Sequence, residues 1–126
     1  MSTTSEVARG DVVVVSYPLI STGLAIRKLR PAVVVSNDVN NRRLPDVTLI
    51  PLTSKTQRAL EATHLFISQD SPEGQQAGIR LDSVVKAETI LTLPRSLIHK
   101  VIGHLPSQVM SSIDRCLALA LGLPPI

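Results

Sequence analysis

The most regular feature of the chain is a series of short apolar runs, separated by polar residues that favour turns. Runs of four to eight β-branched or aliphatic residues bounded by Gly, Pro, Asn or Asp predict β-strands. We therefore expect a mainly β protein in which a curled antiparallel sheet brings these runs together. The predicted strands are Val12–Ser16, Ala32–Ser36, Val47–Leu52, His64–Ile67, Ile79–Ala87 with an extension to Leu91, and His99–Leu105.

The spacing of apolar residues changes near the C-terminus. After Pro106-Ser107, apolar residues recur at steps of three and four, which predicts an amphipathic helix with one buried face. Gly122 and the following prolines end it. Pro94–Leu97 is expected to form a single helical turn. Cys116 belongs to the apolar stripe of the long helix, so we expect it to be a buried small hydrophobe.

The polar segments are predicted as connections. Asn37–Asn41 and Asp70–Gly74 are rich in turn formers, and Thr53–Ala62 is expected to be a loop or a short helix. Ile20–Ile26 is either a plain hairpin connection or a mobile binding loop. Pro51 within an apolar run suggests a bulge or an edge position. Residues 1–8 are predicted to be disordered, and residues 9–126 to form one domain.

Positive charge is concentrated in one part of the chain. Residues 27–58 contain seven Lys or Arg and two Asp, whereas the rest contains six basic and eight acidic residues. This asymmetry favours a polyanionic partner, although a solvated charged face is an equally good interpretation. Tyr17 and Phe66 are the sole aromatic residues, so stacking platforms for nucleic-acid bases are scarce.

The sequence lacks the motifs of several kinds of catalytic or binding site. One cysteine and three scattered histidines do not predict a metal site, no glycine-rich loop opens a helix, and no Gly-x-Ser-x-Gly elbow occurs. We expect neither metal nor cofactor. The longest apolar runs fall short of a membrane span, and residues 1–10 lack an apolar signal core, so a cytoplasmic protein is expected.

What remains is metal-free chemistry on a phosphodiester, for which RNA supplies its own 2′-hydroxyl nucleophile. Arg30 precedes one predicted strand, and Thr53 and Ser54 follow the next. Neighbouring strands could place the guanidinium of Arg30 beside these hydroxyls at one edge of the sheet. An Arg matches phosphate oxygens and stabilises the charge of a pentacovalent intermediate. From the residues alone this is one arrangement among several.

An ordered set of motifs resembles the MazF/PemK toxins. The motifs cover residues 9–123: Arg9-Gly10-Asp11-Val12, Arg30-Pro31-Ala32 through Ser36-Asn37-Asp38, Ile50-Pro51-Leu52-Thr53-Ser54, Ala62-Thr63-His64, Asp82-Ser83-Val84-Val85 and Ile102-Gly103-His104-Leu105. The resemblance implies an SH3-like or CcdB-like β-barrel that acts as a homodimer. It also implies a sequence-specific, metal-independent endoribonuclease that cleaves single-stranded mRNA, leaves a 2′,3′-cyclic phosphate and is inhibited by an acidic antitoxin.

The resemblance also suggests residue roles. Arg30 and Thr53 match the catalytic pair, and Ser54 a phosphate or sugar contact. The segment from Tyr17 to Lys28 matches the flexible loop that contacts bases. The expected RNA-binding residues are therefore Tyr17, Arg27, Lys28, Ser54 and Lys55.

One position departs from the family pattern. Some members carry a second catalytic arginine where this chain has Leu91. The general base is consequently not identified, and Glu88 is a candidate base or base-reading acceptor. Two other functions stay open: a CcdB-like inhibitor of DNA gyrase on the same fold, and a catalytically inactive RNA-binding relative. Arg30 could also simply pair with Asp11 or Asp38, and Thr53 could cap the segment after it.

Overall fold

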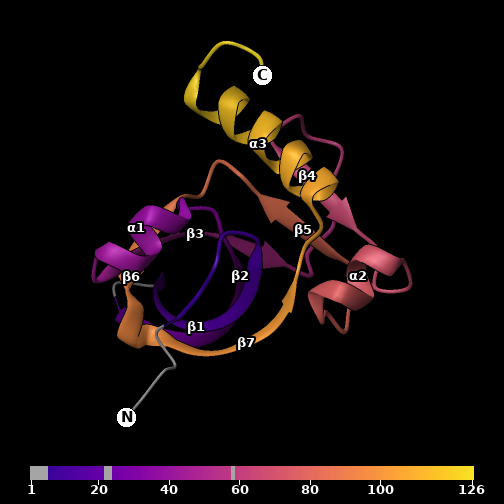
Figure 1. The fold of residues 1–126 in the computed structure, drawn as a ribbon. Coiled ribbons are helices and arrows are strands. Elements are labelled where there is room, and N and C mark those ends of the chain that lie inside the picture. The colour runs from indigo at the N-terminus through magenta and orange to yellow at the C-terminus, as the bar shows by residue number, and fades with distance from the viewer. Residues whose placement is uncertain (1–5, 22–23, 58) are drawn as a thin grey trace.

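The computed structural model describes residues 6–21, 24–57 and 59–126. Its seven strands form one antiparallel sheet in the order β4–β5–β3–β2–β1–β7, with β6 paired to β3 (Figure 1). The strands are β1 (Asp11–Ser21), β2 (Leu24–Val34), β3 (Asp46–Thr53), β4 (His64–Ile67), β5 (Ser83–Lys86), β6 (Leu91–Pro94) and β7 (Ile98–His104). The helices are α1 (Asp38–Arg43), α2 (Pro72–Ala77), the 3-10 turn Arg95–Leu97, and α3 (Ser107–Leu121).

The predicted fold class is confirmed: the protein is mainly β, with a C-terminal helix and short helical segments. The barrel is open, however, because within the described residues the order of paired strands ends at β4 and β7. No helix in this part of the chain is long and apolar enough to span a membrane.

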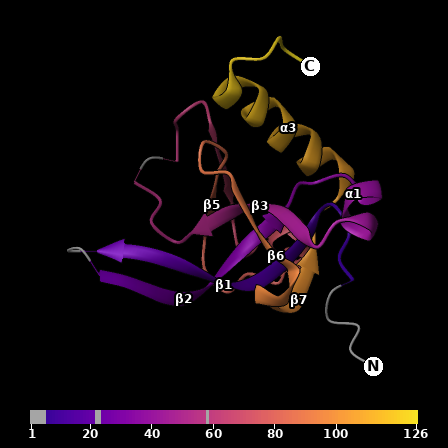
Figure 2. The ribbon, with the colours of Figure 1, turned by 90° about the vertical axis from the view of Figure 1, so that its left-hand side faces the viewer.

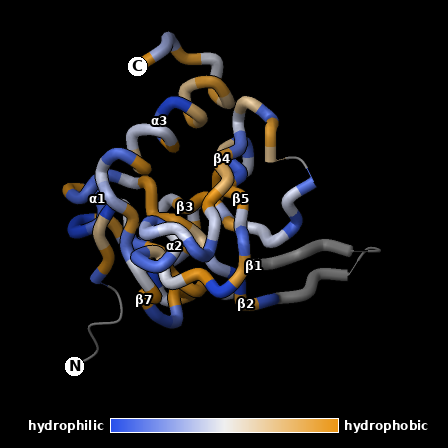
Figure 3. Tube along the Cα trace, turned by 90° about the vertical axis from the view of Figure 1, so that its right-hand side faces the viewer, coloured by the Kyte–Doolittle hydropathy of each residue, from blue (hydrophilic) through white to orange (hydrophobic). Residues whose placement is uncertain are grey.

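Two hydrophobic clusters cover opposite faces of the central strands. The first joins the sheet to Met110, Ile113 and Cys116 of α3, and the second fills the inside of the curl. Val12 belongs to the first cluster and Val13 and Val15 to the second, because alternate residues of a strand face opposite sides. Figure 3 shows the apolar positions concentrated in the strands and in α3. Burial raises the pKa of the Cys116 thiol, as expected for a residue of the core.

The largest difference from the sequence-based prediction is the β1–β2 hairpin. Ile20–Ile26 was expected to be a loop, but Leu19 pairs with Ile26 and Ile20 with Ala25 in a ladder that continues to Ser21↔Leu24. The hairpin projects from the body of the sheet (Figure 2). Pro18 lies beyond the part of β1 that pairs with β7. The segment is therefore mostly strand rather than loop, with residues 22–23 outside the described part. Its role in binding stays a prediction.

Two predicted turns are short helices. The side chain of Asn37 accepts a hydrogen bond from the Asn40 N–H and so caps α1. Ser71 caps α2 in the same way through the Gly74 N–H, and Pro72 occupies the first helical turn. The turn-forming residues act here as helix caps, which a composition-based prediction does not distinguish.

The strand predicted to run from Ile79 to Leu91 is divided into β5 and β6, both paired with β3. β6 pairs with residues 46–49 of β3 and β5 with residues 52–53. Pro51 therefore lies between the two ladders, where an N–H is not required on that side, rather than at an edge of the sheet.

Candidate functional site

The ladder between β2 and β3 ends two residues short of Arg30 and Thr53. Ala32 pairs with Pro51 and Val33 with Ile50. The same register, if continued by two residues, would put Arg30 opposite Thr53. By alternation, Arg30 shares the face of Ala32, and Thr53 the face of Leu49, both in the cluster inside the curl. The register agrees with a guanidinium near a hydroxyl, and that pairing stays a prediction.

Arg30 is half-buried and lines a groove. Its Nε is fully buried and has no hydrogen-bond partner within the described residues. An unsatisfied buried donor is costly, so a side-chain movement that lets an anion accept from it would gain binding free energy.

The acids that could have paired with Arg30 are engaged elsewhere. Asp11 lies 2.8 Å from His104 Nδ1, and its other oxygen accepts from the Ala8 N–H. Asp38 accepts from the Arg9 N–H at 2.7 Å, and this bond lowers the pKa of Asp38 despite the opposing effect of burial. Arg30 is therefore not the partner of either carboxylate.

The hydroxyl of Thr53 forms a local hydrogen bond that holds the residue in place. Its Oγ1 accepts a hydrogen bond of 3.1 Å from the Lys55 N–H, which holds the start of the following segment. The capping role considered from the sequence is thus present. It uses one lone pair of the oxygen, so the O–H of Thr53 can still donate to a phosphate oxygen.

The remaining predicted RNA-binding residues lie around this pair. Lys28, Ser54 and Lys55 are exposed. Tyr17 and Arg27 lie in the hairpin strands, where Tyr17 pairs with Lys28 and Arg27 with Pro18. The side chains of Tyr17 and Arg27 fall outside the described part of the structure.

Glu88 belongs to a different cluster. Its Oε2 lies 2.8 Å from Nε2 of the buried His64, and its Oε1 accepts from the Thr63 hydroxyl at 3.0 Å. Burial disfavours the charged form, but hydrogen bonds from His64, the backbone and Thr63 outweigh it and lower the pKa of Glu88. Through these two bonds, Glu88 in the turn after β5 holds Thr63, which precedes β4, and His64, which begins β4. Its role as a base stays a prediction.

A groove of about 740 Å³ runs beside Arg30. Its walls come from Leu29–Pro31 of β2, Leu52 and Ser54 at the end of β3, Gly78–Leu81 and Ser83 between α2 and β5, and Lys100–Ile102 of β7. No sequence pattern predicts that Arg80 and Lys100 lie near Arg30, because each is a single basic residue far from residues 27–58. Their proximity depends on α2 packing against β7.

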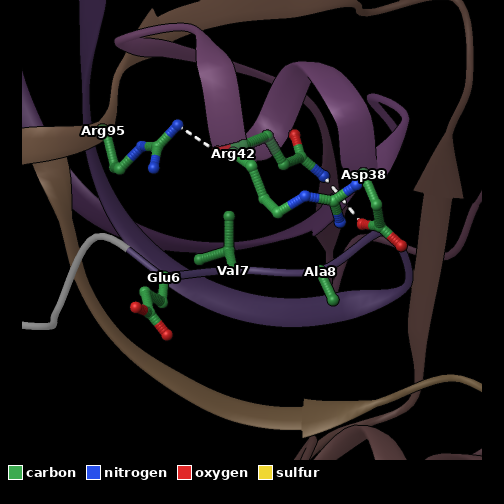
Figure 4. Close-up of a pocket in the computed structure, with 7 residues that line it drawn as sticks. Glu6, Val7, Ala8, Asp38, Arg42 and Arg95 are labelled. Carbon is green, nitrogen blue, oxygen red and sulfur yellow. Dashed lines mark hydrogen bonds between the residues drawn. The ribbon is translucent and has the colours of Figure 1, made fainter.

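A second pocket, of about 560 Å³, lies where Arg95 supports the end of α1 (Figure 4). Arg95 Nη2 donates to the carbonyls of Asn41 and Leu44 at the end of α1. Arg42 in the lining is accompanied by Glu6 and Asp38, so the charge is mixed. Arg95 caps the last carbonyls of the helix, as basic residues often do. Among the described residues no group of three or more His, Cys, Asp or Glu could hold a metal ion.

Comparison with known proteins decides the family. Residues 8–121 match the model of the PemK-like, MazF-like toxins of type II toxin–antitoxin systems. The chain belongs to this toxin family. The match spans the sheet and all of the helices.

Individual relatives agree with the family match. The chain is 30% identical over 117 residues to the endoribonuclease EndoA of Bacillus subtilis (strain 168), covering 93% of this chain and 96% of that protein. It resembles a solved endoribonuclease from a mycobacterial species with a TM-score of 0.72 and 28% identity, covering 94% of each chain. A mycobacterial endoribonuclease solved with its cognate antitoxin gives a TM-score of 0.70 at 29% identity, covering 94% of this chain and 97% of that one.

Leu91 lies at the start of β6. It pairs with the buried Leu49 of β3 and is itself half-buried.

Proposed function

We propose that the protein is a metal-independent endoribonuclease that cleaves single-stranded mRNA in the cytoplasm at a specific short sequence, acts as a homodimer and is inhibited by an acidic antitoxin. Membership of the toxin family supports the class, and the names of the relatives supply the reaction. The observation that carries the proposal is the half-buried Arg30, whose Nε has no partner among the described residues and which lies two residues beyond a β2–β3 ladder whose register points to Thr53.

The proposed step is an internal displacement at phosphorus. The 2′-oxygen of the RNA forms a bond to phosphorus and gives its proton to a base, while the bond to the 5′-oxygen breaks and that oxygen takes up a proton. The products are a 2′,3′-cyclic phosphate and a 5′-hydroxyl. Arg30 stabilises the charge that develops on the non-bridging oxygens, and the O–H of Thr53 orients one of them.

The other residues have supporting roles. Arg27, Lys28, Ser54 and Lys55 hold the phosphates and sugars on either side of the cut, and Tyr17 provides a stacking surface for one base. Glu88 is the candidate base, although it must first exchange its hydrogen bonds with His64 and Thr63.

Arg30→Ala tests the proposal directly. In EDTA, the wild-type protein should cut a mixed-sequence RNA at one short motif, and Arg30→Ala should lower the rate by about 10²–10³. Thr53→Val should cost about tenfold, the effect of one lost hydrogen bond. Rates are measured on gels, and the 5′-hydroxyl is detected by labelling the product with polynucleotide kinase without prior phosphatase treatment.

Arg43→Ala is the matched control, because Arg43 is an exposed arginine of α1 whose side chain donates a hydrogen bond to Asn40. Full activity of Arg30→Ala would reject the site, and cleavage that requires a divalent metal would reject the mechanism. Inhibition of gyrase supercoiling without RNA cleavage would favour a CcdB-like activity instead.

A further inference from the structure

Phe66 is an exposed aromatic residue to which the site described above gives no role. The chain contains two aromatic residues, Tyr17 and Phe66, and the side chain of Phe66 is the one that the structure describes. Phe66 lies on β4, at one end of the strand order, and is 45% exposed. Exposure of a single apolar residue is ordinary and does not indicate a function. What distinguishes Phe66 is its register with Thr53.

Two strand pairings put Phe66 and Thr53 in one row of the sheet. Thr53 of β3 pairs with Val84 of β5, and Val84 pairs with Phe66 of β4. Residues opposite one another in an antiparallel sheet project from the same face, so both side chains leave the sheet on one side. Partners in such a row are about 5 Å apart, which puts the Cα atoms of Thr53 and Phe66 roughly 10 Å from each other. Val84 between them is 1% exposed, so the two residues flank a closed apolar surface.

The neighbouring row shows which face this is. Leu52, Val85 and Leu65 occupy that row, and all three belong to or pack against the core cluster that includes residues of α3. Because alternate residues of a strand face opposite sides, Thr53 and Phe66 point away from this cluster. The ring of Phe66 therefore lies on the face that carries the Thr53 hydroxyl, and not on the face that α3 covers.

A positive charge lies on the same face. Lys86 of β5 is two residues from Val84, pairs with His64 of β4 and is half-buried. Its ammonium has no hydrogen-bond or ion-pair partner in the described part of the chain. The carboxylate of Glu88, two residues further, contacts His64 and Thr63 instead. Three adjacent strands thus present a hydroxyl, a positive charge and an aromatic ring on one face.

This combination matches a nucleotide of single-stranded RNA. Aromatic side chains bind unpaired bases by stacking, and lysines contact the phosphates that join them. A second copy of the chain could also cover Phe66, because β4 has a strand partner on one side only. The row that leads from Phe66 to Thr53 favours RNA, since a strand held at the Thr53 hydroxyl by one phosphate has its neighbouring bases close to the ring.

We propose that Phe66 is the stacking platform for one unpaired base next to the phosphate that is cut, and that Lys86 contacts the phosphate of the same nucleotide. The inference rests on the proposed function, since it takes the Thr53 hydroxyl as the group that holds the reacting phosphate. It adds a second aromatic contact to the one expected from Tyr17. Phe66 and Lys86 bind and position the RNA and take no part in the chemical step.

The test removes the ring and the base separately. A short labelled RNA spans the mapped cut and stays intact because it carries a 2′-deoxynucleotide at the cleaved position. In fluorescence anisotropy, Phe66→Ala should weaken its binding about tenfold or more, whereas Phe66→Tyr should stay within about twofold of wild type. An abasic nucleotide at one position beside the cut should cost wild type a similar factor, and should cost Phe66→Ala less than about twofold.

Further variants separate stacking from folding and from charge. Val39→Ala shortens an exposed apolar side chain of α1 and should leave RNA binding unchanged. Lys86→Gln should make the logarithmic salt dependence of binding shallower by about 0.7. On cleavable RNA, Phe66→Ala should raise KM while kcat stays within about twofold. If urea titration shows that Phe66→Ala is unfolded, Phe66→Leu takes its place, since it keeps an apolar side chain and loses the ring.

Three results would overturn the proposal: wild-type affinity in Phe66→Ala, equal effects of every abasic substitution on the two proteins, or a changed mass of Phe66→Ala in sedimentation. The last would assign the ring to a contact between copies. Cleavage that depends on Arg30, together with wild-type affinity in Phe66→Ala, rejects the stacking platform alone. If wild-type protein cuts no RNA, the abasic scan is made on oligo-U, and a loss that requires Phe66 then rejects the proposed function while the stacking contact stands.

Discussion

At the scale of residues, single side chains join segments that are far apart in the sequence. Arg9 contacts two of them: its backbone N–H donates to Asp38 and one guanidinium nitrogen to the Val35 carbonyl, both at the junction of β2 and α1, and another guanidinium nitrogen bonds to Asp114 of α3. His104 and Glu88 make similar links to Asp11 and His64. These polar contacts fix the ends of the strands around the site.

The sequence located Arg30 and Thr53 because each stands at the end of an apolar run, and strand pairing then determines what lies opposite. It did not locate Arg80 and Lys100, since their neighbours in space come from the docking of α2 on β7. It also could not assign Glu88 to His64, because the two residues are 24 positions apart.

Replacement of Glu88 should make stability less dependent on pH. The lowered pKa means that the folded state favours the charged carboxylate, so its stabilisation is present above the unfolded pKa of about 4.3 and is lost as pH falls through the lower folded value. Glu88→Gln should therefore reduce the free energy of unfolding by about 0.5–1 kcal/mol at pH 7, the size for a partly exposed pair, and by less near pH 3.

Urea titrations at both pH values measure the difference. An equal loss at pH 3 and pH 7 would contradict the assigned charge effect. Asp70→Asn, at an exposed position before α2, serves as a control for a general effect of removing one acid.

At the scale of elements, hydrophobic period predicted the strands and α3 well, whereas polar connections were the main source of error. Asn37 and Ser71 initiate helices instead of turns, because capping and turn formation favour the same side chains. The hairpin was shortened in the prediction because Pro18 and Gly23 suggested an interruption. Pro18 fits in this two-stranded ribbon because β7 does not pair with β1 at that position. The point at which β7 stops pairing cannot be read from the sequence around Pro18.

Gly103→Ala should destabilise the protein by about 1–3 kcal/mol, because the new methyl group overlaps the backbone of Gln76 and Ala77 and forces α2 away from β7. Gly122→Ala is the comparison: its Cβ meets no atom within 4 Å, so its cost is restricted to the backbone conformation at φ 70°. Urea unfolding measures both, and equal stability of Gly103→Ala and wild type would contradict the close contact.

At the scale of the whole molecule, positive charge from distant parts of the chain gathers on one groove. Its lining includes Arg30 of β2, Arg80 from the segment between α2 and β5, and Lys100 of β7. The net charge of +3 does not reveal this arrangement. Charge asymmetry in the sequence favoured a polyanionic partner or a solvated charged face, but it did not point to Arg80 and Lys100, which lie outside residues 27–58.

The salt dependence of RNA binding should show whether the exposed Lys28 and Lys55 contact phosphates. With the inactive Arg30→Ala variant, the logarithm of the RNA association constant should fall linearly with the logarithm of salt concentration. Lys28→Gln/Lys55→Gln should make that slope shallower by about 1.4, since each lost phosphate contact on a single strand removes about 0.7. Fluorescence titrations between 50 and 200 mM salt measure the slopes, and an unchanged slope would remove both lysines from the RNA site.

The position of β1 has a consequence for the time at which this protein becomes functional. β1 lies between β2 and β7, so the first strand to be synthesised completes its pairing with the last, and Asp11 meets His104 across 93 positions. Pairings between such distant segments form slowly, because closing the long intervening loop costs conformational entropy before any stabilising contact forms. A chain still on the ribosome lacks the β7 wall of the groove and the support that α3 gives the sheet. The topology therefore sets an interval in which a newly made chain has not yet completed its sheet.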